Sequence, residues 1–274
     1  MKTDAYLITC LTNLHVGSGE SNYGVVDNLV QRDPITNIPV IHSSSLKGAL
    51  REYFKDRIDK VKLNYIFGPD SQRDSTSDSG IGHYKFFEAN MIVLPVRSNV
   101  KPFYRATSKF LLEDIKEKAD AFNIEFNLPI IPFTNNAPSV STASILEPET
   151  GCILEDWDAI GNLNIENGNN YIGENPALFH TDSFKELANH LPVIARNQLE
   201  NGESKNLWYE EVVPRESRFV FFVTTDGNYE KDFEDKLNGK VVQIGGNASI
   251  GYGYCKVEKI SEEKSNKNEN AIVE

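Results

Sequence analysis

One segment near the N-terminus constrains the fold of this chain more than any other: residues 14–51, LHVGSGESNYGVVDNLVQRDPITNIPVIHSSSLKGALR. Glycine recurs over residues 17–24, which predicts an irregular loop. The turn-forming sequence DPITN, residues 33–37, lies between β-prone stretches at Leu29–Arg32 and Pro39–Ile41. This order predicts a hairpin directly after the loop.

The same segment ends in the start of a helix. The serines Ser43–Ser45 precede apolar residues at helical spacing, so we expect an N-cap run that opens an amphipathic helix to about Ile58. A helix start presents free N–H groups and the positive end of the helix dipole, and Lys47 and Arg51 lie four residues apart on one helical face. This combination suits a phosphate. An ordinary N-cap with solvated basic side chains explains the segment equally well.

Asp27 follows the glycine-rich loop and precedes the predicted hairpin. A lone loop carboxylate could bind a metal ion or orient a proton. Taken alone, however, the residue is better explained as a turn aspartate. His15 lies nearby in the sequence and could take part in acid–base chemistry, although a structural loop histidine is the more common case.

A second glycine-rich element, QIGGNASIGYG, occupies residues 243–253. Glycines let a backbone approach a polyanion closely, and a strand is expected directly afterwards. The element lacks the Lys-Ser/Thr pair of a P-loop and the spacing of a dinucleotide fingerprint. By itself it fits a tight β-turn better than a ligand loop.

The rest of the pattern is mixed, and the expected fold class is α+β: a decorated ferredoxin-like (RRM-like) core. We expect residues 1–260 to form a single domain, with an acidic insertion region at about 119–184. A long hairpin is predicted at about 192–213, and residues 261–274 form a polar tail that we expect to be disordered.

Charge is distributed unevenly along the chain, whose 28 basic and 40 acidic side chains give a net charge of −12. Residues 31–62 carry seven basic and four acidic side chains, whereas residues 119–184 carry ten acidic and no Lys or Arg. An anionic ligand would therefore be expected to bind near residues 31–62 and away from residues 119–184.

Several classes of protein are disfavoured by composition. The sequence has no apolar run of about 18 residues and no signal-peptide pattern at its N-terminus. Its three cysteines, Cys10, Cys152 and Cys255, are widely spaced and odd in number, which predicts neither a disulfide framework nor a zinc site. We therefore expect a cytoplasmic protein that does not contact membranes.

Taken together, residues 14–51 and 243–257 resemble the N-terminal signature and the C-terminal glycine-rich loop of the RAMP superfamily, RNA-binding proteins of CRISPR effector complexes with a ferredoxin-like fold. Two further motifs, LPVRS at 94–98 and NLWYEEVVP at 206–214, resemble the repeated backbone subunit of type III-B (Cmr) complexes. The related type III-A backbone subunit shares both ends and is usually shorter. His42 departs from the pattern, since the family commonly has glycine before the serines.

The resemblance implies a function in antiviral defence. Copies of the chain would bind along a CRISPR RNA in a head-to-tail filament, with other Cmr subunits, and cleave complementary target RNA at regular intervals with a divalent metal, Mg or Mn. The hairpin at 192–213 would be a thumb that wedges into the guide–target duplex. The resemblance assigns both cleavage and metal binding to Asp27. The RNA-binding residues that it implies are Ser43, Ser44, Ser45, Lys47, Arg51, Gly245, Gly246, Asn247, Ser249 and Gly251.

Two other functions stay open. The first is a purely structural RNA-binding subunit, and the presence of Asp27 favours the catalytic reading over it. The second is a metabolic enzyme with glycine-rich phosphate loops, which the missing Walker and Rossmann patterns disfavour. Because no nucleophile–base pair can be assembled from the sequence, we expect the RNA 2′-hydroxyl to act as the nucleophile.

Overall fold

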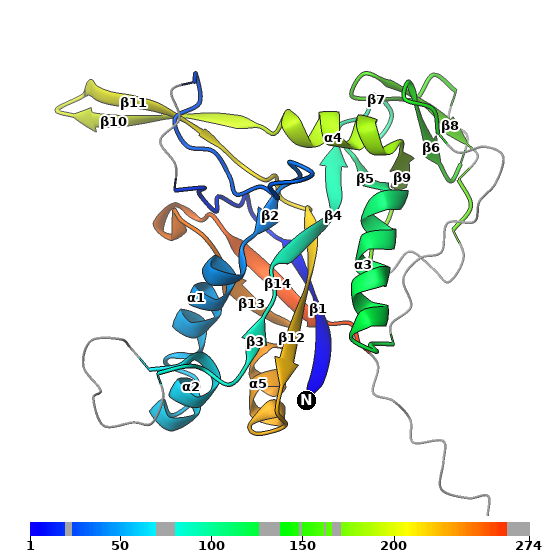
Figure 1. Cartoon of the computed structure of the whole chain (residues 1–274). Helices are drawn as coiled ribbons and strands as arrows, with labels where there is room; N and C mark the ends of the chain where they lie inside the picture. Colours follow the sequence, from blue (N-terminus) through cyan, green and yellow to red (C-terminus); the bar gives the residue numbers. More distant parts are fainter. Residues whose placement is uncertain are drawn as a thin grey trace, which may run out of the picture.

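The chain is represented by a computed structural model, whose described residues are 1–19, 24–69, 80–125, 138–147, 150–161, 163–165 and 171–261. They form a 12-stranded sheet, five helices, and a two-stranded hairpin that projects from the body (Figure 1). The prediction of a mixed α and β fold is confirmed. In the described part of the chain, no helix is long and apolar enough to cross a membrane.

The large sheet contains both antiparallel and parallel pairs. Its main path runs, in order of pairing, through β13 (Lys240–Gln243), β14 (Tyr254–Lys259), β1 (Lys2–Cys10), β12 (Arg218–Thr225), β4 (Ala89–Val96), β5 (Tyr104–Ser108), β9 (Pro176–Phe179), β6 (Thr142–Ile145), β8 (Trp157–Gly161) and β7 (Ile153–Leu154). The short strands β2 (Val40–Ile41) and β3 (Lys85–Phe86) pair with β4 and β12.

The helices cover both faces of this sheet, because its central strands are apolar on both sides. In β12, Phe219, Phe221 and Val223 face one core, while Val220 and Phe222 face the other. The first core also receives buried side chains from α1 (Ser43–Phe54), α2 (Lys60–Phe67), α4 (Thr181–Asn189) and α5 (Glu230–Leu237). The second is covered mainly by α3 (Lys109–Ala121).

The start of α1 differs from the prediction. The three serines are residues of its first turn, and His42 occupies the N-cap with extended backbone (φ −57°, ψ 146°). The expected N-cap role of the serines is therefore wrong. The Oε1 atom of Gln31 accepts the His42 N–H at 2.8 Å, which fixes the backbone ahead of the helix. The helix also ends at Phe54 rather than near Ile58.

The acidic segment contributes to the sheet and the core, which its composition did not predict. Its described residues include β6, β7, β8 and β9, and Ala143, Leu154 and Phe179 within them are fully buried. The indole N–H of Trp157 donates to the Val140 carbonyl at 2.9 Å. The predicted tail lies outside the described residues from position 262 onward.

The projecting hairpin consists of β10 (Val193–Glu200) and β11 (Glu203–Glu211), within the range that the sequence predicts. Its turn residues Asn201 and Gly202 both have positive φ, at 52° and 85°. Two-residue turns in which both residues have positive φ match the right-handed twist of the flanking strands. The sequence Asn-Gly thus explains why the chain reverses at this point.

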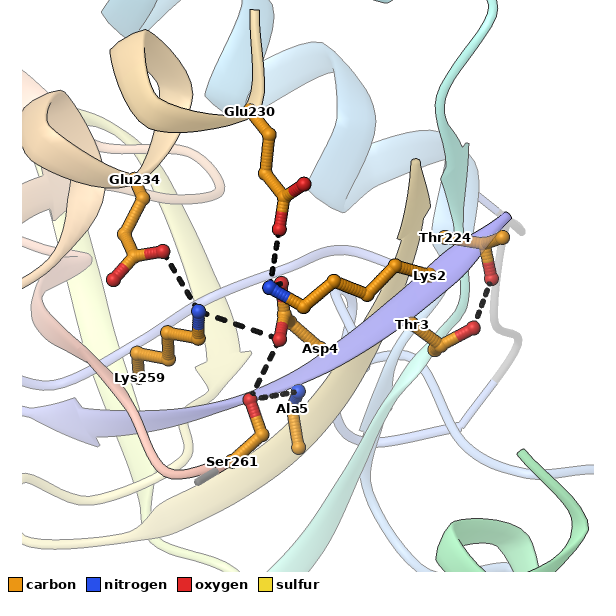
Figure 2. Close-up of polar contacts among 9 residues, drawn as sticks. All are labelled: Lys2, Thr3, Asp4, Ala5, Thr224, Glu230, Glu234, Lys259 and Ser261. Carbon is orange, nitrogen blue, oxygen red and sulfur yellow. Dashed lines mark hydrogen bonds and ion pairs between the residues drawn. The ribbon is translucent and has the colours of Figure 1, made fainter. Parts of the chain in front are cut away.

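A buried charge cluster joins β1, β14 and α5 near the N-terminus (Figure 2). The Nζ atom of Lys259 lies 3.3 Å from Asp4 Oδ1 and 2.7 Å from Glu234 Oε2. The hydroxyl of Ser261 donates to Asp4 Oδ1 at 3.0 Å, and Lys2 pairs with Glu230. The Asp4 and Lys259 side chains are only 5% and 6% exposed, so their charges must be compensated within this cluster, where Lys2 also lies 3.5 Å from Asp4 Oδ2.

Candidate nucleic-acid interface

Asp27 lies at the base of the hairpin. Its backbone N–H and that of Asn28 donate to the Tyr209 carbonyl of β11 at 3.0 and 3.2 Å. In return, the Tyr209 N–H donates to Asp27 Oδ2 at 2.7 Å. The side chain is exposed, and in the described part of the chain its Oδ1 atom has no hydrogen-bond partner. A carboxylate fixed by one oxygen and open at the other suits contact with a ligand.

Glu211 of β11 holds the residues that follow Asp27 through two further hydrogen bonds. The buried Glu211 carboxylate accepts the Val30 N–H at 3.0 Å and Arg32 NH2 at 2.6 Å. The Arg32 guanidinium also donates to the Ala188 carbonyl at the end of α4. The chain that follows Asp27 is thereby tied to β11 through a charge-assisted contact.

Glu210 connects the hairpin to the C-terminal glycine-rich loop. Its buried Oε2 atom accepts Arg196 Nε at 2.8 Å and Asn247 Nδ2 at 2.9 Å. Its Oε1 atom lies 3.8 Å from His15 Nε2, and His15 Nδ1 lies 2.7 Å from the Glu211 carbonyl oxygen. His15 is buried, so it links structural elements rather than facing a ligand.

Close packing inside the protein requires glycine at position 245 of the C-terminal loop. The Gly246 N–H donates to the His15 carbonyl at 2.9 Å. Gly245 has φ +80°, and a Cβ atom there would lie 2.3 Å from the same carbonyl oxygen. Beyond this contact, Ser249 and Gly251 are exposed around the short 3₁₀ turn η1 (Ala248–Ile250).

Gln31 joins the N-terminal loop to the start of α1. Its Nε2 atom donates to the Gly17 carbonyl at 3.2 Å and to Ser45 Oγ at 2.8 Å, while its Oε1 atom accepts the His42 N–H. The buried Gln31 amide therefore connects the N-terminal loop at Gly17 to His42 and Ser45 at the start of α1. Through Gln31 and His15, the structure brings the serines, the N-terminal loop and the C-terminal loop together.

The first turn of α1 is polar and open. Ser43 and Ser44 are exposed. Among the described residues, the His42 side chain does not cap the helix with a hydrogen bond to its first turn. Burial lowers the pKa of Lys47 from its ordinary value, and the positive charges of Lys85 and Arg51 lower it further. Both cations thus act unfavourably on the positive charge of Lys47, and a bound anion would offset their effect.

Arg51 also makes a contact within the protein that the sequence did not predict. Its NH1 atom donates at 2.6 Å to the carbonyl of Gly68, the residue that follows α2. That contact assigns Arg51 to joining the two helices. Sequence reasoning also missed Gln31, Glu210 and Glu211, although the first lies in the quoted Q-R-D motif and the others in LWYEEVVP.

The described residues do not form a protein-only metal site. Among them, no group of three or more His, Cys, Asp or Glu side chains is arranged to hold a metal ion. One oxygen of Asp27 already accepts a backbone N–H, which leaves a single open carboxylate oxygen. Mg²⁺ is usually bound through one or two carboxylates together with substrate phosphates and water, so a cation at Asp27 would take its other ligands from RNA and solvent.

Comparison with known proteins extends these observations. The family model described as the RAMP superfamily matches residues 7–256. The CRISPR system Cmr endoribonuclease Cmr4 of Pyrococcus furiosus is 32% identical, and the match covers 92% of this chain and 95% of that protein. The chain belongs to the RAMP superfamily and, within it, to the family of Cmr4.

Solved structures show the same fold. The crystal structure of oligomeric Cmr4 from Pyrococcus furiosus superposes with a TM-score of 0.68 at 24% identity, covering 96% of this chain and 100% of that one. A chain in the cryo-EM structure of the type III-B Cmr-beta complex bound to cognate target RNA gives 0.72 at 20% identity, with 95% and 98% coverage. The large sheet and its helices are thus those of Cmr4.

Proposed function

We propose that this chain is the repeated backbone subunit of a type III-B CRISPR ribonucleoprotein, which binds the CRISPR RNA and cleaves complementary target RNA at regular intervals. The observation that carries the proposal is Asp27, an exposed carboxylate held by Tyr209 at the base of a projecting hairpin. The relative that matches nearly the whole chain is named an endoribonuclease.

A decorated ferredoxin-like core in a single domain, residues 1–260, is part of this proposal. Its support is the order β1, α1, β4, β12, α5, β14 along the chain. In the sheet these four strands lie in the order β14-β1-β12-β4, all antiparallel. The two crossover helices pack on the same core. The remaining strands and the acidic segment would be additions to this unit.

Guide binding would use the surface where the two glycine-rich segments and α1 meet. The open first turn of α1 and Lys47 suit a phosphate, and Ser249 and Gly251 are exposed on the adjoining loop. Arg51 would act indirectly, because its guanidinium is engaged by Gly68. A small set of local cations can neutralise phosphates even though the whole chain carries a charge of −12.

Cleavage would place the target strand beside the hairpin, which acts as the thumb. In-line attack by a 2′-hydroxyl is not accessible within an A-form duplex, so the thumb would hold one nucleotide in a splayed, near-attack arrangement. The open oxygen of Asp27 would accept or orient the proton of that hydroxyl. A divalent cation, Mg or Mn, would stabilise charge on the phosphate and would take most of its ligands from RNA and water.

The proposed partners are a CRISPR RNA, a target RNA, further copies of this chain and other Cmr subunits. Support comes from a Cmr4 structure described as oligomeric and from a type III-B complex solved with target RNA. Copies that track one RNA require a head-to-tail contact, which propagates rather than closes. A head-to-tail filament is therefore the arrangement that we propose.

The test begins with purification of the chain together with its neighbours. We expect short RNAs with a shared 5′ sequence to co-purify, and an added complementary RNA to be cut at even spacing. Cutting that is unchanged in an Asp27→Ala complex would favour the alternative, a purely structural backbone subunit. Absence of any bound RNA would refute both.

A further inference from the structure

An aromatic pocket of about 450 Å³ opens beside the first residue of α1. Its lining residues come from the start of α1, from β3, β4 and the junction between them, from β12, and from the end of α3. Phe87, Phe122 and Phe222 supply apolar surface, and Ser43, Glu88 and Lys118 are polar members of its lining. Volumes of this size are typical of small-ligand sites.

The three rings form a continuous aromatic surface. The ring centroids of Phe87 and Phe122 are 4.9 Å apart, and those of Phe122 and Phe222 are 5.9 Å apart. Phe222 is buried in the sheet, whereas Phe87 and Phe122 are only half-buried. The partly exposed ring surface is the kind on which a planar group stacks.

The polar lining carries both signs of charge. The Lys118 ammonium donates to Asn90 Oδ1 at 2.9 Å and to Asp114 Oδ2 at 2.7 Å. The Glu88 carboxylate accepts Asn90 Nδ2 at 3.1 Å, and its other oxygen lies 3.9 Å from His42 Nδ1. The pairing of Lys118 with Asp114 and the negative charge of Glu88 disfavour a phosphate in the pocket. Glu88 and Lys118 can instead offer an acceptor and a donor to the edge of a neutral ring.

We propose that this pocket binds one nucleobase of the guide RNA, stacked on Phe87 or Phe122. The inference rests on the proposed function, since the base would belong to a nucleotide adjoining the phosphate at the start of α1. Ser43 supports this continuity, because it lies in the first turn of α1 and also lines the pocket. Single-stranded RNA is commonly held by stacking bases on aromatic side chains while cations hold the backbone.

The first experiment compares guide binding by the full chain and by Phe87→Leu and Phe122→Leu variants, which keep an apolar side chain but lose the ring. We expect each to weaken binding about tenfold per bound copy, with an unchanged salt slope, because stacking rather than a phosphate contact is lost. Phe103→Leu is the matched control, a half-buried phenylalanine outside this pocket.

The second experiment leaves the protein unaltered and removes single bases from the guide. One abasic position within each subunit's footprint should cost about tenfold, and at that position the leucine variants should bind as well as the parent chain. Equal binding at every abasic position would overturn the pocket assignment. So would leucine variants that lose RNA-independent self-association, because another copy of the chain would then be the occupant.

A third variant separates this inference from the proposed function. If Lys47→Ala weakens guide binding while the leucine variants and the abasic guides have no effect, only the pocket assignment fails. If the parent chain and its assembled complex bind no RNA at all, the proposed function itself fails.

Discussion

The backbone N–H of Tyr209 donates a 2.7 Å hydrogen bond to the carboxylate of Asp27, across 182 positions of the chain. This contact makes the position of the candidate cleavage residue depend on the foot of the hairpin. A displacement of β11 would therefore move the carboxylate and the projecting strands together. The geometry explains why a loop residue can be fixed well enough for proton transfer.

Replacement of Asp27 by Asn tests its charge separately from its position, because an amide oxygen can still accept the Tyr209 N–H. We expect target cleavage to fall by about 10²- to 10⁴-fold, the usual contribution of a positioned acid or base. Guide affinity should not change. The measurement is single-turnover cleavage by the assembled complex, with the exposed Asp56→Asn as the matched control. Parent-like cleavage by Asp27→Asn would exclude a role for the charge.

Lys47 and Arg51, which the sequence grouped together, should behave differently. Lys47→Ala should lower the salt slope of RNA binding by about one unit per lost phosphate contact. Arg51→Ala should instead reduce the free energy of unfolding by about 1.5 kcal/mol, because it removes a charged donor from the Gly68 carbonyl. Salt titrations of RNA binding and urea denaturation distinguish the two. The exposed Lys55→Ala serves as control, and equal salt slopes for all three variants would contradict the assignment of Lys47.

The sequence was most informative where local chemistry decides the structure. The hairpin expected at about 192–213 and the amphipathic helix expected after the serines both form, the latter with Leu46, Leu50 and Phe54 on its buried face. These outcomes depend on backbone preference and on apolar spacing, which are visible within a few residues. The serines were misplaced because a distant side chain, that of Gln31, fixes the backbone ahead of α1.

Long-range pairing could not be predicted from local patterns. Nothing near Glu210 in the sequence indicates that it joins Arg196 to Asn247, because these residues meet only after the hairpin and the C-terminal loop have folded. The acidic composition of residues 119–184 likewise concealed short apolar stretches that complete the sheet. The location of Asp27 beside Tyr209 depends on the same kind of tertiary contact.

The charge cluster of Figure 2 should contribute to stability without affecting RNA binding. After Lys259→Met, the nearby cation that remains to Asp4 among the described residues is Lys2, 3.5 Å away and 45% exposed at its side chain. We therefore expect the free energy of unfolding to fall by about 3 kcal/mol. Adding Asp4→Asn should recover part of the loss, since the buried charge is then removed. Lys256→Met, on the same strand but 43% exposed at its side chain, is the control. Denaturant unfolding measures all four proteins, and a Lys259→Met variant as stable as this control would contradict the prediction.

Asp33 should give the fold a dependence on acid pH. Burial acts to raise the pKa of its carboxyl, but hydrogen bonds from Thr36 and Ile35, with the charge of Lys118, hold it below the ordinary value of 3.8. The stability it provides is therefore present above about pH 4 and is lost as the pH falls through the lowered folded value. Asp33→Asn should remove this dependence. Denaturation between pH 7 and pH 2 measures it, and a stability difference between the two proteins that stays constant over that range would refute the prediction.

The last prediction concerns the nucleophile. Within the described residues, the Asp27 side chain is hydrogen-bonded to a backbone N–H and not to a Ser, Cys or His that could serve as a nucleophile. The nucleophile is therefore expected to come from the RNA, whose 2′-hydroxyl adjoins each phosphate. One 2′-deoxy substitution in the target, 5′ to a cut, should block cleavage there while the other cuts and the binding affinity are retained. Mapping the fragments from a singly substituted target tests this, with a 2′-deoxy nucleotide between two cuts as the control. Continued cutting at the deoxy position would show that water attacks instead, and Asp27 would then act on that water.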